Sequence, residues 1–110
     1  MATAYKILGQ SEPGTTSNAN LYTVPAATEA IVSTIVVCNT SGTDAAFRIF
    51  VRASAATAST GNAVAFDAPL TANTQAAFTL GLTLSATDVI SVRSSVGASL
   101  TFSAFGSELS

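Results

Sequence analysis

Residues 28–39 read Thr-Glu-Ala-Ile-Val-Ser-Thr-Ile-Val-Val-Cys-Asn and form the most strand-like segment of the chain. The run is rich in β-branched residues, which favour extended backbone. Pro25 precedes it and the turn formers Asn39-Thr40-Ser41-Gly42 end it, so we predict one strand of about ten residues between two turns. Alternate positions place apolar side chains on both faces, which predicts a central strand that is covered on both sides.

Segments on either side of this run also have the composition or alternation of strands. They are residues 4–10, 21–24, 46–53, 64–66, 78–84, 89–94 and 99–105, and Gly81 is a candidate bulge. No segment has the period of a helix, and turn formers separate the runs. About eight short strands predict an all-β, single-domain antiparallel β-sandwich of jelly-roll type over residues 1–110.

Short connections suggest how some of these strands pair. Residues 28–39 and 46–53 are separated by about six residues, which favours a hairpin. A second hairpin is predicted at residues 95–97, between the last two strands. Residues 54–62 are rich in Ala, Ser, Thr and Gly and predict an exposed loop.

The composition is poor in charge. Charged residues make up 9% of the chain, against about 25% in an ordinary soluble domain, and mean hydropathy is +0.49. Because surface charge helps to keep free monomers dispersed, a net charge of −2 suggests that other subunits cover part of the exterior. The alternative is a solitary monomer in which small Ala, Thr and Ser residues raise the index.

Charge and hydropathy also bear on partners. Four basic residues and a pI near 4.6 give no electrostatic footprint for nucleic acid. No apolar run approaches the roughly 18–20 residues of a membrane span, and residues 1–10 lack a basic region followed by a hydrophobic one. We therefore expect a soluble protein without a secretion signal that binds neither nucleic acid nor membrane.

The residues of common catalytic sites are missing or scattered. The chain has no His, the usual general base and a common metal ligand. Its carboxylates occur singly, mostly at predicted turns or strand ends: Glu12, Glu29, Asp44, Asp67, Asp88 and Glu108. Cys38 lies within the apolar run and is expected to fill the core. We predict no enzyme activity and no catalytic, cofactor-binding or metal-binding residues.

Arg48, Phe50 and Arg52 alternate with Phe47, Ile49 and Val51 and so share one strand face. An aromatic side chain between two arginines on an exposed face suits a protein interface. These three residues are our candidate interface. The alternative is that this face packs on the second sheet while the arginines extend to solvent.

Several strings of the sequence resemble small virion proteins of tailed bacteriophages, especially phages of cyanobacteria and other marine bacteria. They are residues 5–10 (Tyr-Lys-Ile-Leu-Gly-Gln), 21–25 (Leu-Tyr-Thr-Val-Pro), 30–39, and 105–108 (Phe-Gly-Ser-Glu). The similarity covers nearly the whole chain, including the spacing from the Thr-Val-Pro entry to the valine-rich strand that ends in Cys-Asn.

The resemblance implies a non-enzymatic structural protein located in the virion. A capsid decoration or cement protein is the first expectation, stabilising the phage head through oligomeric contacts. It would bind the major capsid protein or other virion proteins, as a homo-oligomer with a trimer favoured. The alternative is a neck, tail or baseplate accessory protein that contacts host-surface glycans. The resemblance brings no cofactor and no catalytic motif.

Overall fold

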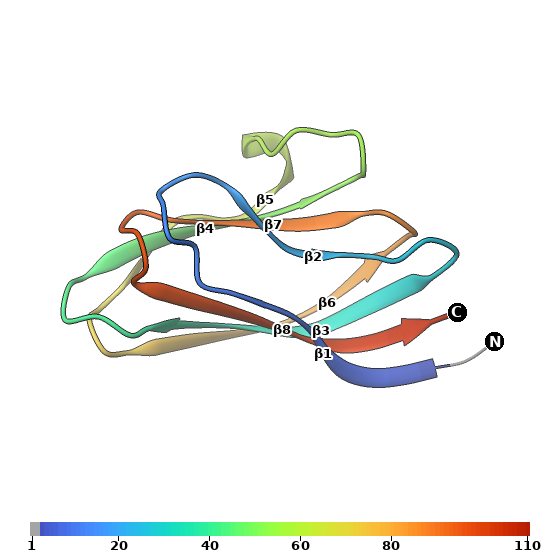
Figure 1. Ribbon diagram of the computed structural model, residues 1–110, viewed down its shortest axis with the longest axis horizontal. Coiled ribbons are helices and arrows are strands. Elements are labelled where there is room, and N and C mark those ends of the chain that lie inside the picture. Colours follow the sequence, from blue (N-terminus) through green and yellow to red (C-terminus); the bar gives the residue numbers. More distant parts are fainter. Residues whose placement is uncertain (1–2) are drawn as a thin grey trace.

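The computed structural model describes residues 3–110, which form two stacked antiparallel sheets (Figure 1). The strands are β1 (Thr3–Ser11), β2 (Ala19–Thr23), β3 (Glu29–Asn39), β4 (Ala45–Arg52), β5 (Ala63–Leu70), β6 (Gln75–Leu84), β7 (Val89–Ser94) and β8 (Leu100–Leu109). One short 3-10 helix, η1 (Thr60–Asn62), precedes β5. The predicted β-sandwich and its eight strands are confirmed.

Sheet A has the strand order β1-β8-β3-β6 and sheet B the order β2-β7-β4-β5. Each strand except β4 is followed by a strand of the opposite sheet, so the connections pass back and forth between the layers. This alternation, with every pairing antiparallel, defines a jelly roll. The predicted jelly-roll arrangement is therefore confirmed.

Both predicted hairpins are wrong. β3 pairs with β6 and β8 in sheet A, whereas β4 lies in sheet B, and β7 and β8 likewise belong to different sheets. The buried side chain of Asn39 accounts for the first crossing. Its Nδ2 donates to the carbonyl oxygens of Thr43 at 2.9 Å and Leu70 at 3.1 Å, which directs the chain toward sheet B.

β3 is the central strand that its sequence predicts, but only its inner face is covered. Val32, Ile35 and Val37 are fully buried between the sheets. A register shift between Val32 and Thr34 breaks the simple alternation, which is why an even and two odd positions share the inner face. Ile31 is 42% exposed on the opposite side, so the expected cover on both faces is absent.

Cys38 also corrects an expectation. It is half-buried rather than buried, because Val37 takes the inner position and its neighbour must point to the outer face of sheet A. The prediction that Cys38 fills the core is therefore wrong.

The two sheets meet in an aromatic contact. Phe47 on β4 lies edge-on to Phe78 on β6 and to Phe102 on β8, with ring centroids 5.8 Å and 6.2 Å apart. Such edge-to-face pairs add about 0.5–1.5 kcal/mol to the burial of the rings. Since Phe47 belongs to sheet B and the other two rings to sheet A, this cluster joins the layers.

Bulges and a close glycine contact shape sheet A. Gly81 has φ +64° at the point where β6 carries one more residue than β3 between paired positions, which confirms the predicted bulge. Gly106 on β8 is constrained by its neighbour, since a Cβ there would lie 2.0 Å from the carbonyl oxygen of Ile31.

A polar contact ties one end of the sandwich. Tyr22 on β2 donates its hydroxyl hydrogen to Glu108 on β8, and the Lys6 ammonium on β1 lies 2.8 Å from the same carboxylate. These hydrogen bonds from Lys6 and Tyr22 lower the pKa of Glu108. Sheet B is thereby linked to sheet A through one charged side chain.

We predict that Gly106→Ala destabilises the fold by at least about 2 kcal/mol, because the added methyl group must displace backbone rather than a flexible side chain. Gly42→Ala is the matched control, since an added Cβ there meets nothing within 4 Å. Urea unfolding of the two variants checks this. Equal midpoints would show that the β8 and β3 backbones can separate without cost.

We also predict that the stabilising effect of Glu108 depends on pH. A lowered folded-state pKa means that the contribution of the carboxylate is present above its ordinary pKa and lost as pH falls through the folded value. The difference in unfolding free energy between the wild type and Glu108→Gln should therefore be positive near neutral pH and shrink below about pH 4. Glu29→Gln removes the same charge at an exposed position and is the control; an equal pH dependence in that variant would contradict the assignment.

Candidate functional site

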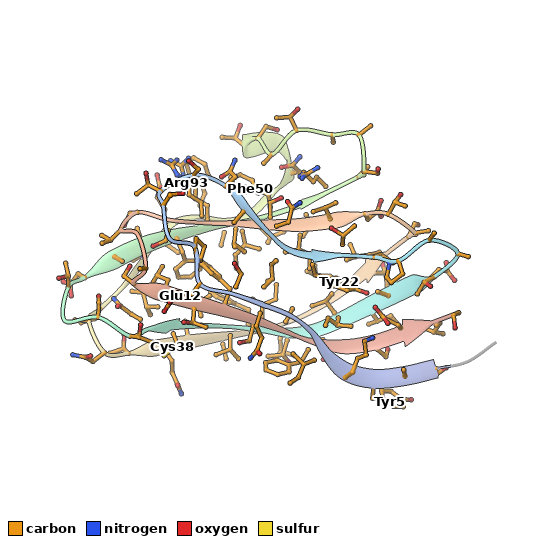
Figure 2. All side chains as sticks on the ribbon, in the orientation of Figure 1. Tyr5, Glu12, Tyr22, Cys38, Phe50 and Arg93 are labelled. Atoms are coloured by element: carbon orange, nitrogen blue, oxygen red, sulfur yellow. The ribbon has the colours of Figure 1, made fainter. Side chains whose placement is uncertain are left out.

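The candidate interface residues lie on the outer face of sheet B. Phe47 and Ile49 occupy the inner face of β4 and belong to the core, so Arg48, Phe50 and Arg52 point away from sheet A. The alternative that this face packs on the second sheet is therefore wrong. Figure 2 shows Phe50 together with Arg93 on the outer side of the upper sheet. Whether the three residues form a protein interface stays a prediction.

Phe50 is not the exposed aromatic that the sequence suggests. It is only 3% exposed, although it is absent from the core cluster between the sheets. The connection from β4 to β5 (residues 53–62) folds back over sheet B, as the loop above β4 and β5 in Figure 1, and Ala58, Ser59 and Thr60 lie beside Phe50. A bland loop thus covers a large apolar side chain.

Arg52 fastens this loop to the sheet. Its guanidinium donates to the carbonyl oxygen of Ala56 at 2.8 Å, to Ser91 Oγ at 3.0 Å and to Asn20 Oδ1 at 3.2 Å. The three acceptors come from the loop, β7 and β2. Because these hydrogen bonds engage all three of its nitrogens, Arg52 has a structural role in holding the loop over Phe50.

Arg48 is placed by a bulge in β5. Between the pairs Phe47–Ala68 and Ile49–Ala65 the strand β5 carries one extra residue, and Asp67 there has φ +51°, a conformation that Asp tolerates better than most residues. This bulge turns two consecutive side chains, Phe66 and Asp67, toward Arg48.

The resulting contacts hold the guanidinium of Arg48 on two sides. Its Nε and Nη2 donate to the two carboxylate oxygens of Asp67 at 2.7 Å and 3.1 Å, and its carbon Cζ lies 3.9 Å from the centroid of the Phe66 ring. The hydrogen bonds from Arg48 lower the pKa of Asp67, and those with Asp67 raise the pKa of Arg48. The cation is therefore fixed in position, with 25% of its side chain exposed.

Arg93 completes the cluster, and its place beside Arg48 was not predicted from the sequence. It lies directly opposite Arg48 in the ladder of β4 and β7. Its Nε donates to the carbonyl oxygen of Thr16 at 2.6 Å, and its positive charge contributes to the lowered pKa of Asp67. Only the strand register, which single-sequence patterns do not reveal, brings these two arginines together.

A groove of about 480 Å³ opens above these residues. The connection from β1 to β2 supplies Thr16, Ser17 and Asn18, the β4–β5 loop supplies Ala58, Ser59 and Thr60, and the sheet supplies Arg48, Phe50, Phe66 and Arg93. We call this the cationic groove. A second hollow of about 230 Å³ adjoins the same two arginines and Asp67.

The outer face of sheet A is different in kind. Tyr5, Ile7 and Ile31 are 85%, 55% and 42% exposed, and the half-buried Phe105 pairs with Ile7 across β1 and β8. Tyr5 lies on the outer side of the lower sheet in Figure 2. We call Tyr5, Ile7, Ile31 and Phe105 the apolar patch. From Ile31 to Cys38, the residues of β3 and their partners on β6 and β8 carry no charge, but Glu29, two positions before Ile31, is exposed on the same face.

Most of the carboxylates have local structural partners. Asp44 accepts from the backbone nitrogen of Ala72 and Asp88 from that of Ser85, both at 2.9 Å, as expected of turn residues. Within residues 3–110, no three His, Cys, Asp or Glu side chains gather closely enough to hold a metal ion.

In the described part of the chain, no helix is both long and apolar enough to span a membrane.

The class of protein that this architecture defines is a jelly-roll β-sandwich. No family model and no curated protein matches the chain. Solved structures with the same fold include a chain of the T13 viral particle of infectious bursal disease virus, with 18% identity and a TM-score of 0.57. Another is a chain of the VP2 subviral particle of that virus, with 15% identity and a TM-score of 0.53.

Both alignments cover 97% of this chain but only 30% and 31% of the viral chains. The chain therefore spans less than a third of the length of the structures that it matches. At this level of identity, the likeness shows the fold alone.

We predict that Arg52→Ala loosens the β4–β5 loop without unfolding the sandwich, because the hydrogen bonds of Arg52 join the loop to the sheet. Limited proteolysis should cut residues 53–62 faster than in the wild type, and amide exchange there should rise. Lys6→Ala removes one positive charge from sheet A and is the control. Unchanged cleavage in Arg52→Ala would mean that packing on Phe50 alone holds the loop.

Proposed function

We propose that this chain is a non-enzymatic structural protein of a virion, and specifically a decoration or cement protein of a tailed-phage head. The observation that carries the proposal is the apolar patch on the outer face of sheet A. Its three most exposed side chains leave roughly 300–400 Å² of surface open, a size at which apolar patches on monomers are often functional.

The partner that suits this face is a subunit of the capsid shell. The side chains of the patch carry no charge, and the exposed Glu29 borders them at the start of β3. A shell protein that leaves Glu29 at the rim can cover the patch at low cost. The polar positions around the patch, such as Thr34 and Ser103, extend the contact toward the roughly 800 Å² per partner of a stable interface. A trimer across capsomer junctions would repeat this contact three times and stabilise the shell by mass action.

Two further findings support a virion role. The chain shares its fold with chains from particles of infectious bursal disease virus. Four carboxylates within residues 3–110, those of Asp44, Asp67, Asp88 and Glu108, make turn or ion-pair contacts, which favours a structural role for them.

We predict that purified protein binds phage heads lacking it and raises the temperature at which they break, and that Ile31→Glu weakens this binding at least tenfold. A buried carboxylate without a partner would oppose the contact. Val64→Glu is the matched control, since Val64 is similarly exposed at 46% but lies on β5 of sheet B. Equal loss in both variants, or binding to tails and not to heads, would overturn the proposal.

Sedimentation tests the oligomer separately. The protein should form a trimer at high concentration or when bound to the head. A monomer in both states would contradict the trimer, and the capsid contact would still be tested by the binding assay.

The second candidate is an accessory protein of the neck, tail or baseplate that contacts host-surface glycans. The cationic groove favours this candidate, because a polar hollow beside an aromatic ring suits a sugar. The groove lies on sheet B, so a contact through sheet A would leave it open. Labelling the protein on intact particles separates the two candidates, since the first requires signal over the head and the second requires signal at the neck, tail or baseplate.

A further inference from the structure

The cationic groove contains a charge arrangement that the fold alone does not require. Arg48 and Arg93 face each other directly across β4 and β7, and like charges at opposed positions destabilise a sheet. Asp67 is the carboxylate beside this pair of arginines, and both of its oxygens accept hydrogen bonds from Arg48. The groove therefore keeps an excess positive charge on a chain whose net charge is −2.

Arg93 is the cation with capacity for another partner. Within residues 3–110 its hydrogen bond is that of Nε to the carbonyl of Thr16, and its Nη atoms make no hydrogen bond to a described residue. A guanidinium binds a carboxylate through two parallel N–H donors. The hydrogen bond to Thr16 leaves the Nη groups of Arg93 available for such a contact at the groove.

The remaining lining favours a sugar over a simple anion. Phe66 is 45% exposed and offers an apolar surface beside the cations. Ser17, Asn18, Ser59 and Thr60 carry hydroxyl or amide groups at the same groove, and such groups donate to and accept from sugar hydroxyls. The volume of about 480 Å³ lies in the range of small-molecule sites.

The site is also held in place before any ligand arrives. The bulge at Asp67 and the Phe66 ring fix Arg48, and the Arg52 hydrogen bonds hold the loop that carries Ser59 and Thr60. Fixed donors lose less freedom when a ligand binds.

From these observations we propose that the cationic groove binds a carboxylate-bearing saccharide, such as a uronic acid residue of an acidic polysaccharide. The carboxylate is held by Arg93 with help from the charge of Arg48, and the sugar ring lies near Phe66 between the two loops. This inference deepens the second candidate function and rests on it for the source of the ligand, a glycan on the host surface. Binding by the groove itself can be tested on the purified protein.

The test is calorimetric titration of the intact protein with trigalacturonic acid at low salt. Binding should be at least tenfold weaker for the methyl-esterified trisaccharide, which keeps the rings and removes the charge, and should weaken as salt is added. Inorganic phosphate and a hexaglutamate peptide are the comparison ligands. Binding of phosphate or of the peptide as tight as that of the trisaccharide would overturn the proposal, in favour of a plain anion site or a protein interface.

Variants locate the site. Arg93→Ala should weaken trigalacturonate binding at least tenfold, Arg93→Lys should weaken it less, and Lys6→Ala, which removes a charge from the other sheet, should leave it unchanged. If Arg93→Ala unfolds, the site is located in the wild type by the amide chemical shifts that change when trigalacturonate is added. Changes at residues 16–18 and 58–60 are expected, and changes confined to other residues would overturn the assignment. Failure of all these titrations while labelled protein is found on tails would refute the saccharide and leave the accessory role standing.

Discussion

The contact of Phe47 with Phe78 and Phe102 is the interaction on which the rest of the structure depends. It is the place where an aromatic side chain of sheet B meets two rings of sheet A. Burying Phe47 inward fixes which residues of β4 point outward, because strand neighbours alternate. Arg48, Phe50 and Arg52 therefore face outward as a consequence of core packing, and the groove is built on the reverse side of that contact.

Irregularities in the strands then give each outer face its character. In sheet A, the shift beside Val32 turns Ile31 outward while Val32 and Ile35 remain buried. In sheet B, the bulge at Asp67 directs a ring and a carboxylate onto Arg48. A regular pleat would present one of these two side chains, since successive residues alternate between faces. The bulges thus concentrate chemistry that the average composition does not suggest.

The two outer faces differ in chemistry. Sheet A offers an uncharged apolar patch, whereas the described outer face of sheet B carries Arg48, Arg52 and Arg93 and is flanked by two polar connections. A protein that binds a partner through one sheet can keep the other sheet open to a soluble ligand. The jelly roll makes this division possible because its two sheets turn opposite faces to the outside.

The sequence by itself determined the class of fold, the eight strands and the outward alternation of Arg48 and Arg52, because period-2 patterns and turn formers are local signals. It did not determine which strands pair. A five-residue connection after β3 fits a hairpin as well as a crossing, and the buried hydrogen bonds of Asn39 decide between them. The cover over Phe50 and the meeting of Arg48 with Arg93 were decided by tertiary structure alone, because both depend on contacts between segments distant in the chain.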